Sequence, residues 1–219
     1  SADKLLNAEN AYAPENIIIR NNEIYNNEKN GIYWGPKNYN NLIEGNNIHN
    51  NGWDGIMIDL CGQYWNPTFE PEPTALQHAI FDGSMNVVAK LNVIEGNGVY
   101  GARVAGTPTN GFQLQAQLNY WGDATGPKHI DTNPDALGDE VSDYVVFEPF
   151  YDNENLTGSL LLSTVSVPTD AYPNLNAALN AVVDEGTILV TGNFDQPAVT
   201  IDKSVTITAV AGVDPVITP

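Results

Sequence analysis

The chain has 219 residues, and its 27 acidic residues outnumber its 8 basic residues to give a formal net charge of −19. Contacts to phosphates need Lys and Arg, so this composition excludes a general nucleic-acid binder and makes anionic membranes unfavourable partners. No apolar run reaches the length of a membrane span, which argues against membrane insertion, and the single cysteine, Cys61, excludes an intrachain disulfide.

The first recognisable elements are two copies of one pattern, in which residues 43–58 repeat residues 19–34 at an offset of 24 residues. Apolar residues alternate with polar ones inside each copy, as in strands with one buried face, and Asn or Gly residues separate these short strands. A repeat of this length predicts a solenoid in which each copy forms one coil. Stacked coils would align an aliphatic, an amide and a charged column: Ile19 over Ile43, Asn22 over Asn46, and Arg20 over Glu44.

A looser third copy is predicted at residues 93–97, whose Ile-Glu-Gly-Asn sequence is aligned with Ile43-Glu44-Gly45-Asn46. This alignment would bring Glu95 close to Glu44. The intervening residues 60–78 contain three prolines, which indicate a loop extruded from one coil. Tyr33 and Met57 alternate with inward residues, so both are predicted to face outward.

Residues 118–127, with the sequence Leu-Asn-Tyr-Trp-Gly-Asp-Ala-Thr-Gly-Pro, resemble the closing motif of many secreted β-helices. Residues 138–150 resemble the tail that follows this motif. Together with the repeats, the resemblance covers residues 16–150 and is to right-handed parallel β-helix proteins, the pectate-lyase-like and NosD-like group. It implies an all-β fold, a right-handed parallel β-helix, with an extracellular or cell-surface location and with Trp121 closing the end of the solenoid.

The last part of the chain is predicted to open a second β-helix segment. Apolar residues in 173–184 follow a helical period, and Gly186 is expected to end that helix. Short strands are expected at residues 187–190, 199–203 and 205–208. The order resembles the amino-terminal cap helix and first coils of the same family. The predicted organisation is therefore rear coils and closing motif at 1–150, a linker at 151–170, and a cap helix with first coils at 171–219.

Both ends of the chain are expected to present open coils, because the amino terminus lacks a cap helix and the carboxy terminus stops after about two coils. Three interpretations remain open. The chain is a segment of a long array, or a protomer that docks head to tail on copies of itself, or its two ends meet within one molecule. Head-to-tail docking predicts that deleting residues 160–219 abolishes assembly.

The sequence does not predict an enzyme. The Asn-x-Asp, Asp-Asp and Gly-His-Gly motifs expected of polygalacturonases are absent, and the three histidines, His49, His78 and His129, are scattered. Asp54 and Asp59 form an acidic pair around one strand, but so acidic a chain produces such pairs by chance. Arg103 is expected to have no partner. No catalytic residue and no metal site are therefore assigned.

Four aromatic residues are candidates for stacking on sugars, the alternative being that they pack beneath the long loop: Tyr33, Trp53, Tyr64 and Trp65. Asn155 lies in an Asn-x-Thr glycosylation sequence. Calcium is the only candidate cofactor, because acidic residues crowd one loop, although a solvated acidic surface would have the same composition: Asp131, Asp135, Asp139, Glu140 and Asp143.

These observations favour a non-catalytic structural component of an extracellular surface assembly, such as a sheath, S-layer-like array, filament or adhesin. Its partners would be copies of itself, arranged head to tail through open coils. The alternative is a fragment of a secreted polysaccharide-binding or polysaccharide-degrading β-helix protein. A polysaccharide is accordingly the second expected partner.

Overall fold

The computed structural model describes residues 15–35, 40–60, 86–108, 111–158 and 160–218. The strands of the coils are β1 (Ile18–Arg20), β2 (Glu23–Tyr25), β3 (Ile32–Trp34), β4 (Asn41–Glu44), β5 (Asn47–His49), β6 (Ile56–Asp59), β7 (Val87–Lys90), β8 (Val93–Glu95), β9 (Ala102–Ala105), β10 (Leu114–Gln115) and β11 (Val145–Val146). The following elements are β12 (Phe150–Tyr151), β13 (Leu160–Val167), α3 (Leu175–Ala181), β14 (Val182–Val190), β15 (Phe194–Asp195), β16 (Thr206–Ala209) and β17 (Ile217–Thr218).

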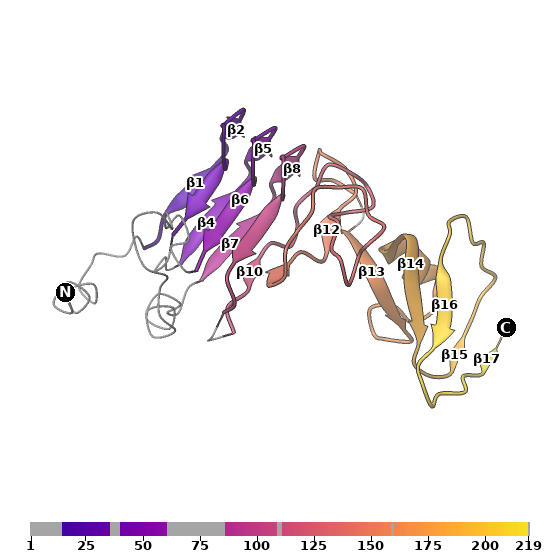
Figure 1. Ribbon diagram of the computed structural model, residues 1–219. Coiled ribbons are helices and arrows are strands. Elements are labelled where there is room, and N and C mark those ends of the chain that lie inside the picture. The colour runs from indigo at the N-terminus through magenta and orange to yellow at the C-terminus, as the bar shows by residue number, and fades with distance from the viewer. Residues whose placement is uncertain (1–14, 36–39, 61–85, 109–110, 159, 219) are drawn as a thin grey trace.

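Three parallel sheets run side by side through the first part of the chain (Figure 1). Their strand orders are β1-β4-β7-β10-β11, β2-β5-β8 and β3-β6-β9. Each of the first three coils contributes one strand to each sheet, whereas β10 and β11 extend only the first sheet. A coil therefore buries its apolar side chains only when neighbouring coils stack on it. The arrangement confirms the parallel β-helix that the repeat predicts.

The columns expected from the 24-residue repeat are confirmed. Ile19 pairs with Ile43 and Arg20 with Glu44, and the outward column continues to Lys90. Arg20 Nε lies 2.8 Å and Lys90 Nζ 3.2 Å from the Glu44 carboxylate. The hydrogen bond from Lys90, with the charges of Arg20 and Lys90, holds the pKa of Glu44 below its usual value.

The predicted alignment of the third copy is wrong. Ile94 stacks on Ile48, not on Ile43, and Ala89 occupies the column of Ile43. The cause is that both turns of a coil use the same local chemistry, a residue with positive φ followed by Asn. Gly45 has φ +66° in the first turn and Gly96 has φ +64° in the second. The similar sequences around Gly45 and Gly96 therefore belong to two different turns of the coil.

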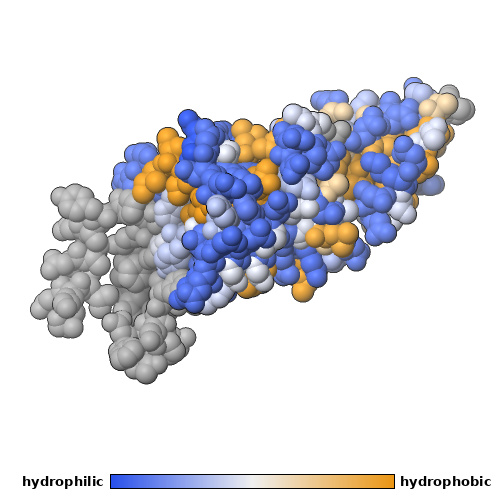
Figure 2. All heavy atoms as spheres, turned by 90° about the horizontal axis from the view of Figure 1, so that it is seen from above, coloured by the Kyte–Doolittle hydropathy of each residue, from blue (hydrophilic) through white to orange (hydrophobic). Residues whose placement is uncertain are grey.

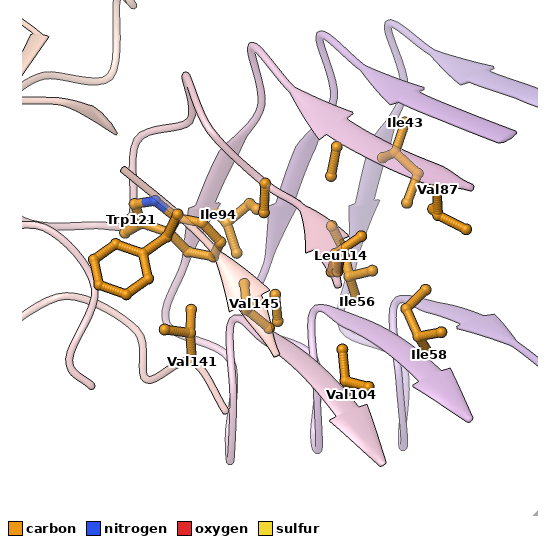
Figure 3. Packing of buried hydrophobic residues seen from close by; sticks show 14 of the residues in the cluster. Ile43, Ile56, Ile58, Val87, Ile94, Val104, Leu114, Trp121, Val141 and Val145 are labelled. Carbon is orange, nitrogen blue, oxygen red and sulfur yellow. The ribbon is translucent and has the colours of Figure 1, made fainter. Parts of the chain in front are cut away.

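Aliphatic side chains from all three sheets point into one continuous core (Figure 3). Trp121 lies in this core with none of its surface exposed, as expected for a residue that closes the solenoid. The prediction that Met57 is exposed is wrong, since only 7% of its surface is accessible. Met57 is on the middle strand of its sheet, and the register places Tyr33 on one side of it and Arg103 on the other.

The second part of the chain adds a parallel sheet, β13-β14-β16, which β12 joins to the first part by antiparallel pairing with β13. β13 lies within the segment predicted as a linker. β15, which follows β14 in the sequence, and β17, which follows β16, form a further parallel pair. The prolines of the predicted 60–78 loop lie outside the described residues, whereas Leu60 is buried.

The predicted helix is present but shorter. Asn174 begins it by accepting a hydrogen bond from the Ala177 N–H, and the helix ends at Ala181, not at Gly186. The β-branched residues that follow pair with β13 from Val182 onward, so Gly186 lies inside β14. The strand expected at residues 199–203 does not form, and the strand expected at 205–208 is β16.

The stacked coils give an elongated molecule with β1–β3 toward one end and β16 and β17 at the other (Figure 1). The face seen in Figure 2 is mainly hydrophilic, with hydrophobic groups both beside the first coils and near the C-terminal end. Exposed apolar residues of that end include Ile207, Val216 and Ile217.

Candidate functional site

Two ladders of side-chain amides run along the solenoid at its two Asn turns. In the first, each Nδ2 donates to the Oδ1 of the next coil at 3.1, 3.0 and 2.9 Å, in the order Asn22, Asn46, Asn92 and Asn119. The backbone N–H of each donor residue reaches the same acceptor oxygen. The predicted stacking of Asn22 over Asn46 is thereby confirmed and extends through four coils.

The second ladder ends in an acid. Its bonds measure 2.8, 2.9 and 2.8 Å in the order Asn27, Asn51, Asn97 and Asp139. The Asp139 carboxylate also accepts the backbone N–H groups of Gly96 and Asn97. A carboxylate only accepts hydrogen bonds, so Asp139 satisfies the last donors without presenting a new one.

The acidic side chains considered for calcium do not form a common site among the described residues. Asp139 binds the ladder, and Asp143 lies 3.5 Å from His129 Nε2. Within the described part of the chain, no group of three or more His, Cys, Asp or Glu side chains is arranged to hold a metal ion.

Burial raises the pKa of Asp139, although its hydrogen bonds from Asn97 and Gly96 oppose that rise. The folded state therefore keeps the Asp139 proton at pH values where the unfolded chain has lost it. This contribution to stability is complete below pH about 3.8 and is lost as pH rises through the folded-state pKa.

We expect the Asp139→Asn variant to lose about 1–3 kcal/mol of unfolding free energy, because one acceptor oxygen becomes an N–H group facing donors. We also expect the loss to be largest at low pH and to shrink as pH rises, since only the wild type carries the Asp139 proton. Urea unfolding at a series of pH values measures both effects. Parallel pH profiles for the two proteins would contradict the assignment.

The first coil, defined here as β1, β2 and β3, forms the outer edge of all three sheets among the described residues. A hollow of about 540 Å³ on it is lined by Ile19, Glu23, Ile24, Tyr25, Asn27, Gly31, Ile32 and Tyr33. Ile19 and Ile24 are only partly buried, whereas their equivalents Ile43 and Ile48 are fully buried. The core is thus less completely covered at this edge than inside the stack.

Tyr25 is the outermost ring of an aromatic column on the first coil. It is 48% exposed and stacks on His49, with ring centroids 5.1 Å apart and planes 3° apart. His49 Nε2 lies 3.5 Å from a Glu23 carboxylate oxygen. This histidine therefore belongs to a surface stack. His129 lies elsewhere, with Nδ1 2.9 Å from Thr132 Oγ1, and His78 is outside the described residues.

Two of the four predicted sugar-stacking residues are described, and both are exposed. Tyr33, on β3, is 42% exposed and its hydroxyl donates to Asp59 at 2.8 Å. Trp53, in the turn before β6, is 43% exposed, and the Lys29 ammonium lies over its ring, 5.0 Å from the ring centroid. Tyr64 and Trp65 lie outside the described residues.

The expectation that Arg103 has no partner is wrong, because its Nη1 lies 3.8 Å from the buried Asp54 carboxylate. Burial raises the pKa of Asp54, and the charge of Arg103 opposes this rise. Asp59 is held by Tyr33, and Glu95 stacks on His49, away from Glu44. Strand pairing between distant coils creates these partners, and local spacing cannot reveal them.

Asn155, the predicted glycosylation residue, is exposed in the turn before β13. Sequence reasoning did not identify Asp139 as the end of a ladder. The signal that could have found the ladder was the five-residue spacing shared by three Asn pairs: Asn22 and Asn27, Asn46 and Asn51, and Asn92 and Asn97.

Comparison with protein families gives a match over residues 9–116 to a family described as a right handed beta helix region. Comparisons with curated proteins and with solved structures give no match. Among the described residues, no helix is both long and apolar enough to cross a membrane.

Proposed function

Because residues 9–116 match a family described as a right handed beta helix region, we propose that this protein is a non-catalytic structural component of an extracellular surface assembly. In this assembly, β-helices stack end to end through open coils. The observation that carries the proposal is the first coil, whose three strands are all sheet edges among the described residues. Unpaired edge strands are templates for pairing with another chain.

The packing of the first coil supports stacking. Ile19 and Ile24 keep part of their surface exposed, while the corresponding residues of the next coil are fully buried. An added coil would cover this apolar surface, and each Å² removed from water contributes about 25 cal/mol. It would also pair the outer backbone groups of three strands at once.

The opposite end offers a second copy as the partner. β16 and β17 are the outer strands of their sheets among the described residues, and both are exposed. Contact between these strands and the first coil of another copy is heterologous, so it would generate a filament or a ring.

Negative-stain electron microscopy of the purified protein tests this proposal, and we expect rods many times longer than one molecule. Deleting residues 160–219 is expected to remove them. The double variant Ile207→Lys with Ile217→Lys, at two exposed positions, is a milder counterpart that places charges on β16 and β17. Rods that persist in both variants would contradict head-to-tail stacking.

Binding of a polysaccharide is the second candidate, favoured by the exposed rings of Tyr33 and Trp53, the latter beside the Lys29 ammonium. Aromatic faces with nearby polar groups suit sugar rings. The same preparation distinguishes the two candidates. Monomers retained on a polysaccharide column would support binding, whereas rods formed without sugar would support the structural role.

A further inference from the structure

We propose that the first coil binds, in preference to other coils, a parallel coil that carries two asparagines five residues apart. This inference rests on the proposed stacking function and names the chemistry of the partner. The inference starts from the hydrogen bonds of the two amide ladders, in which each Nδ2 donates to a side-chain oxygen of the next coil toward the C-terminus.

Each ladder Asn plays two roles. In the inner coils, its Oδ1 accepts from the N–H and Nδ2 of the Asn in the preceding coil, and its Nδ2 donates forward to the following coil, as at Asn46 and Asn92. The Nδ2 of Asn46 also donates back to the Ile19 carbonyl of the preceding coil. The bonds to Oδ1 therefore all run one way: the backbone N–H and one Nδ2 hydrogen donate toward the C-terminal end, and each Oδ1 accepts from the N-terminal side, while the second Nδ2 hydrogen reaches back to a backbone carbonyl.

The two ends of the second ladder consequently differ. The C-terminal end is completed by Asp139, which only accepts. At the N-terminal end of each ladder, Asn22 or Asn27 donates to the next coil. If an added coil repeats the geometry of the inner coils, it would donate to the Oδ1 atoms of these two residues. The matching coil must supply four donors, two backbone N–H groups and two Nδ2 groups. Only Asn or Gln has a side-chain amide, and Asn repeats the length of the ladder.

Two further columns specify the partner. The outward column alternates in charge from Arg20 to Glu44 to Lys90, so an acidic residue belongs over Arg20, two residues before the first Asn. Tyr25 stacks on His49, so an aromatic or imidazole ring belongs over Tyr25, three residues after the first Asn.

Residues 44–51 of this chain satisfy every one of these conditions, with Glu44, Asn46, His49 and Asn51 at the required spacing. The other candidate segments of the chain do not. Asn7 and Asn10 of the N-terminal segment are three apart, and Asn193 is the only asparagine after Asn180. The C-terminal coils of a second copy can supply backbone donors but not the two side-chain amides. We therefore expect them to bind more weakly than an Asn-bearing coil.

Fluorescence anisotropy with labelled synthetic peptides tests the preference on the full-length protein. The probe has the sequence of residues 40–52, and its matched control carries Asn46→Asp and Asn51→Asp, which keeps the shape but removes both Nδ2 donors. A second control carries Glu44→Lys, and a third peptide has the sequence of residues 204–218. Each peptide alone is measured over the same concentrations to exclude self-association.

We expect the probe to bind at least about tenfold more tightly than the Asp control, because two hydrogen-bond donors are lost. The Glu44→Lys and 204–218 peptides are also expected to bind more weakly than the probe. Equal binding by the probe and the Asp control would overturn the inference while leaving stacking intact. Failure of every peptide to bind a protein that forms rods would overturn it too. Failure of every peptide together with an absence of rods would overturn the proposed function itself.

Discussion

Replacing Asn92 with leucine is expected to lower the unfolding free energy by about 3 kcal/mol or more, because several buried polar groups lose their partners together. Asn92 is fully buried in the middle of the first ladder. It accepts from the N–H and Nδ2 of Asn46 and donates to the Asn119 Oδ1 and the Ile43 carbonyl. Leucine has a similar size but can make none of these bonds. Denaturant unfolding, with the midpoint compared at constant slope, measures the loss.

Asn22→Leu is the matched control at the end of the same ladder. Asn22 is exposed, and its side chain donates to Asn46 Oδ1 and to the Arg20 carbonyl. The buried Asn46 Oδ1 keeps its hydrogen bond from the Asn22 backbone N–H in the variant, so we expect a loss below about 1 kcal/mol. Equal losses for Asn22→Leu and Asn92→Leu would show that burial of the ladder does not determine its contribution.

Trp121→Ala is expected to have the largest effect of any side-chain truncation, about 3–5 kcal/mol, because the core cannot collapse around the cavity left by an indole ring. Trp121 is completely buried. It lies beneath the last turns of the solenoid, where Gly101 leaves space for the ring: a Cβ there would lie 3.1 Å from Trp121 Cε3. Thermal and denaturant unfolding measure the loss.

Two controls separate the cavity from other roles of tryptophan. Among the described residues, Trp121 Nε1 has no hydrogen-bond partner, so Trp121→Phe should cost clearly less than Trp121→Ala. Trp53→Ala removes an exposed ring and is expected to change stability by about 0.5 kcal/mol or less. A Trp121→Ala variant as stable as Trp53→Ala would contradict the role of Trp121 in closing the core.

The two ends of the first β-helix thus differ in chemistry. At the closed end, Trp121 fills the core and Asp139 accepts the last donors of one ladder. At the first coil, Ile19 and Ile24 are only partly buried, and the ladders begin with Asn22 and Asn27, which donate to the next coil.

The candidate surface was predictable in part. Alternation places Tyr33 outward, and a turn position leaves Trp53 exposed, so both followed from local sequence. The partners of Asp54, Asp59 and Asp139 did not follow, because each depends on which residue of another coil lies beside it. Glu44 could be paired with Arg20 because an uninterrupted repeat of 24 residues separates them.

The sequence by itself determined the coil, its short strands, its Asn turns and the register of its first two copies. These features depend on residues close in the chain, where side-chain alternation and backbone preferences act directly. Only the tertiary structure decided that Asn97 belongs to the second ladder, that Met57 is covered, and that the helix ends at Ala181. Each of these outcomes depends on strand pairing across coils. That pairing is set by the length of the intervening chain and by competition between helix and sheet.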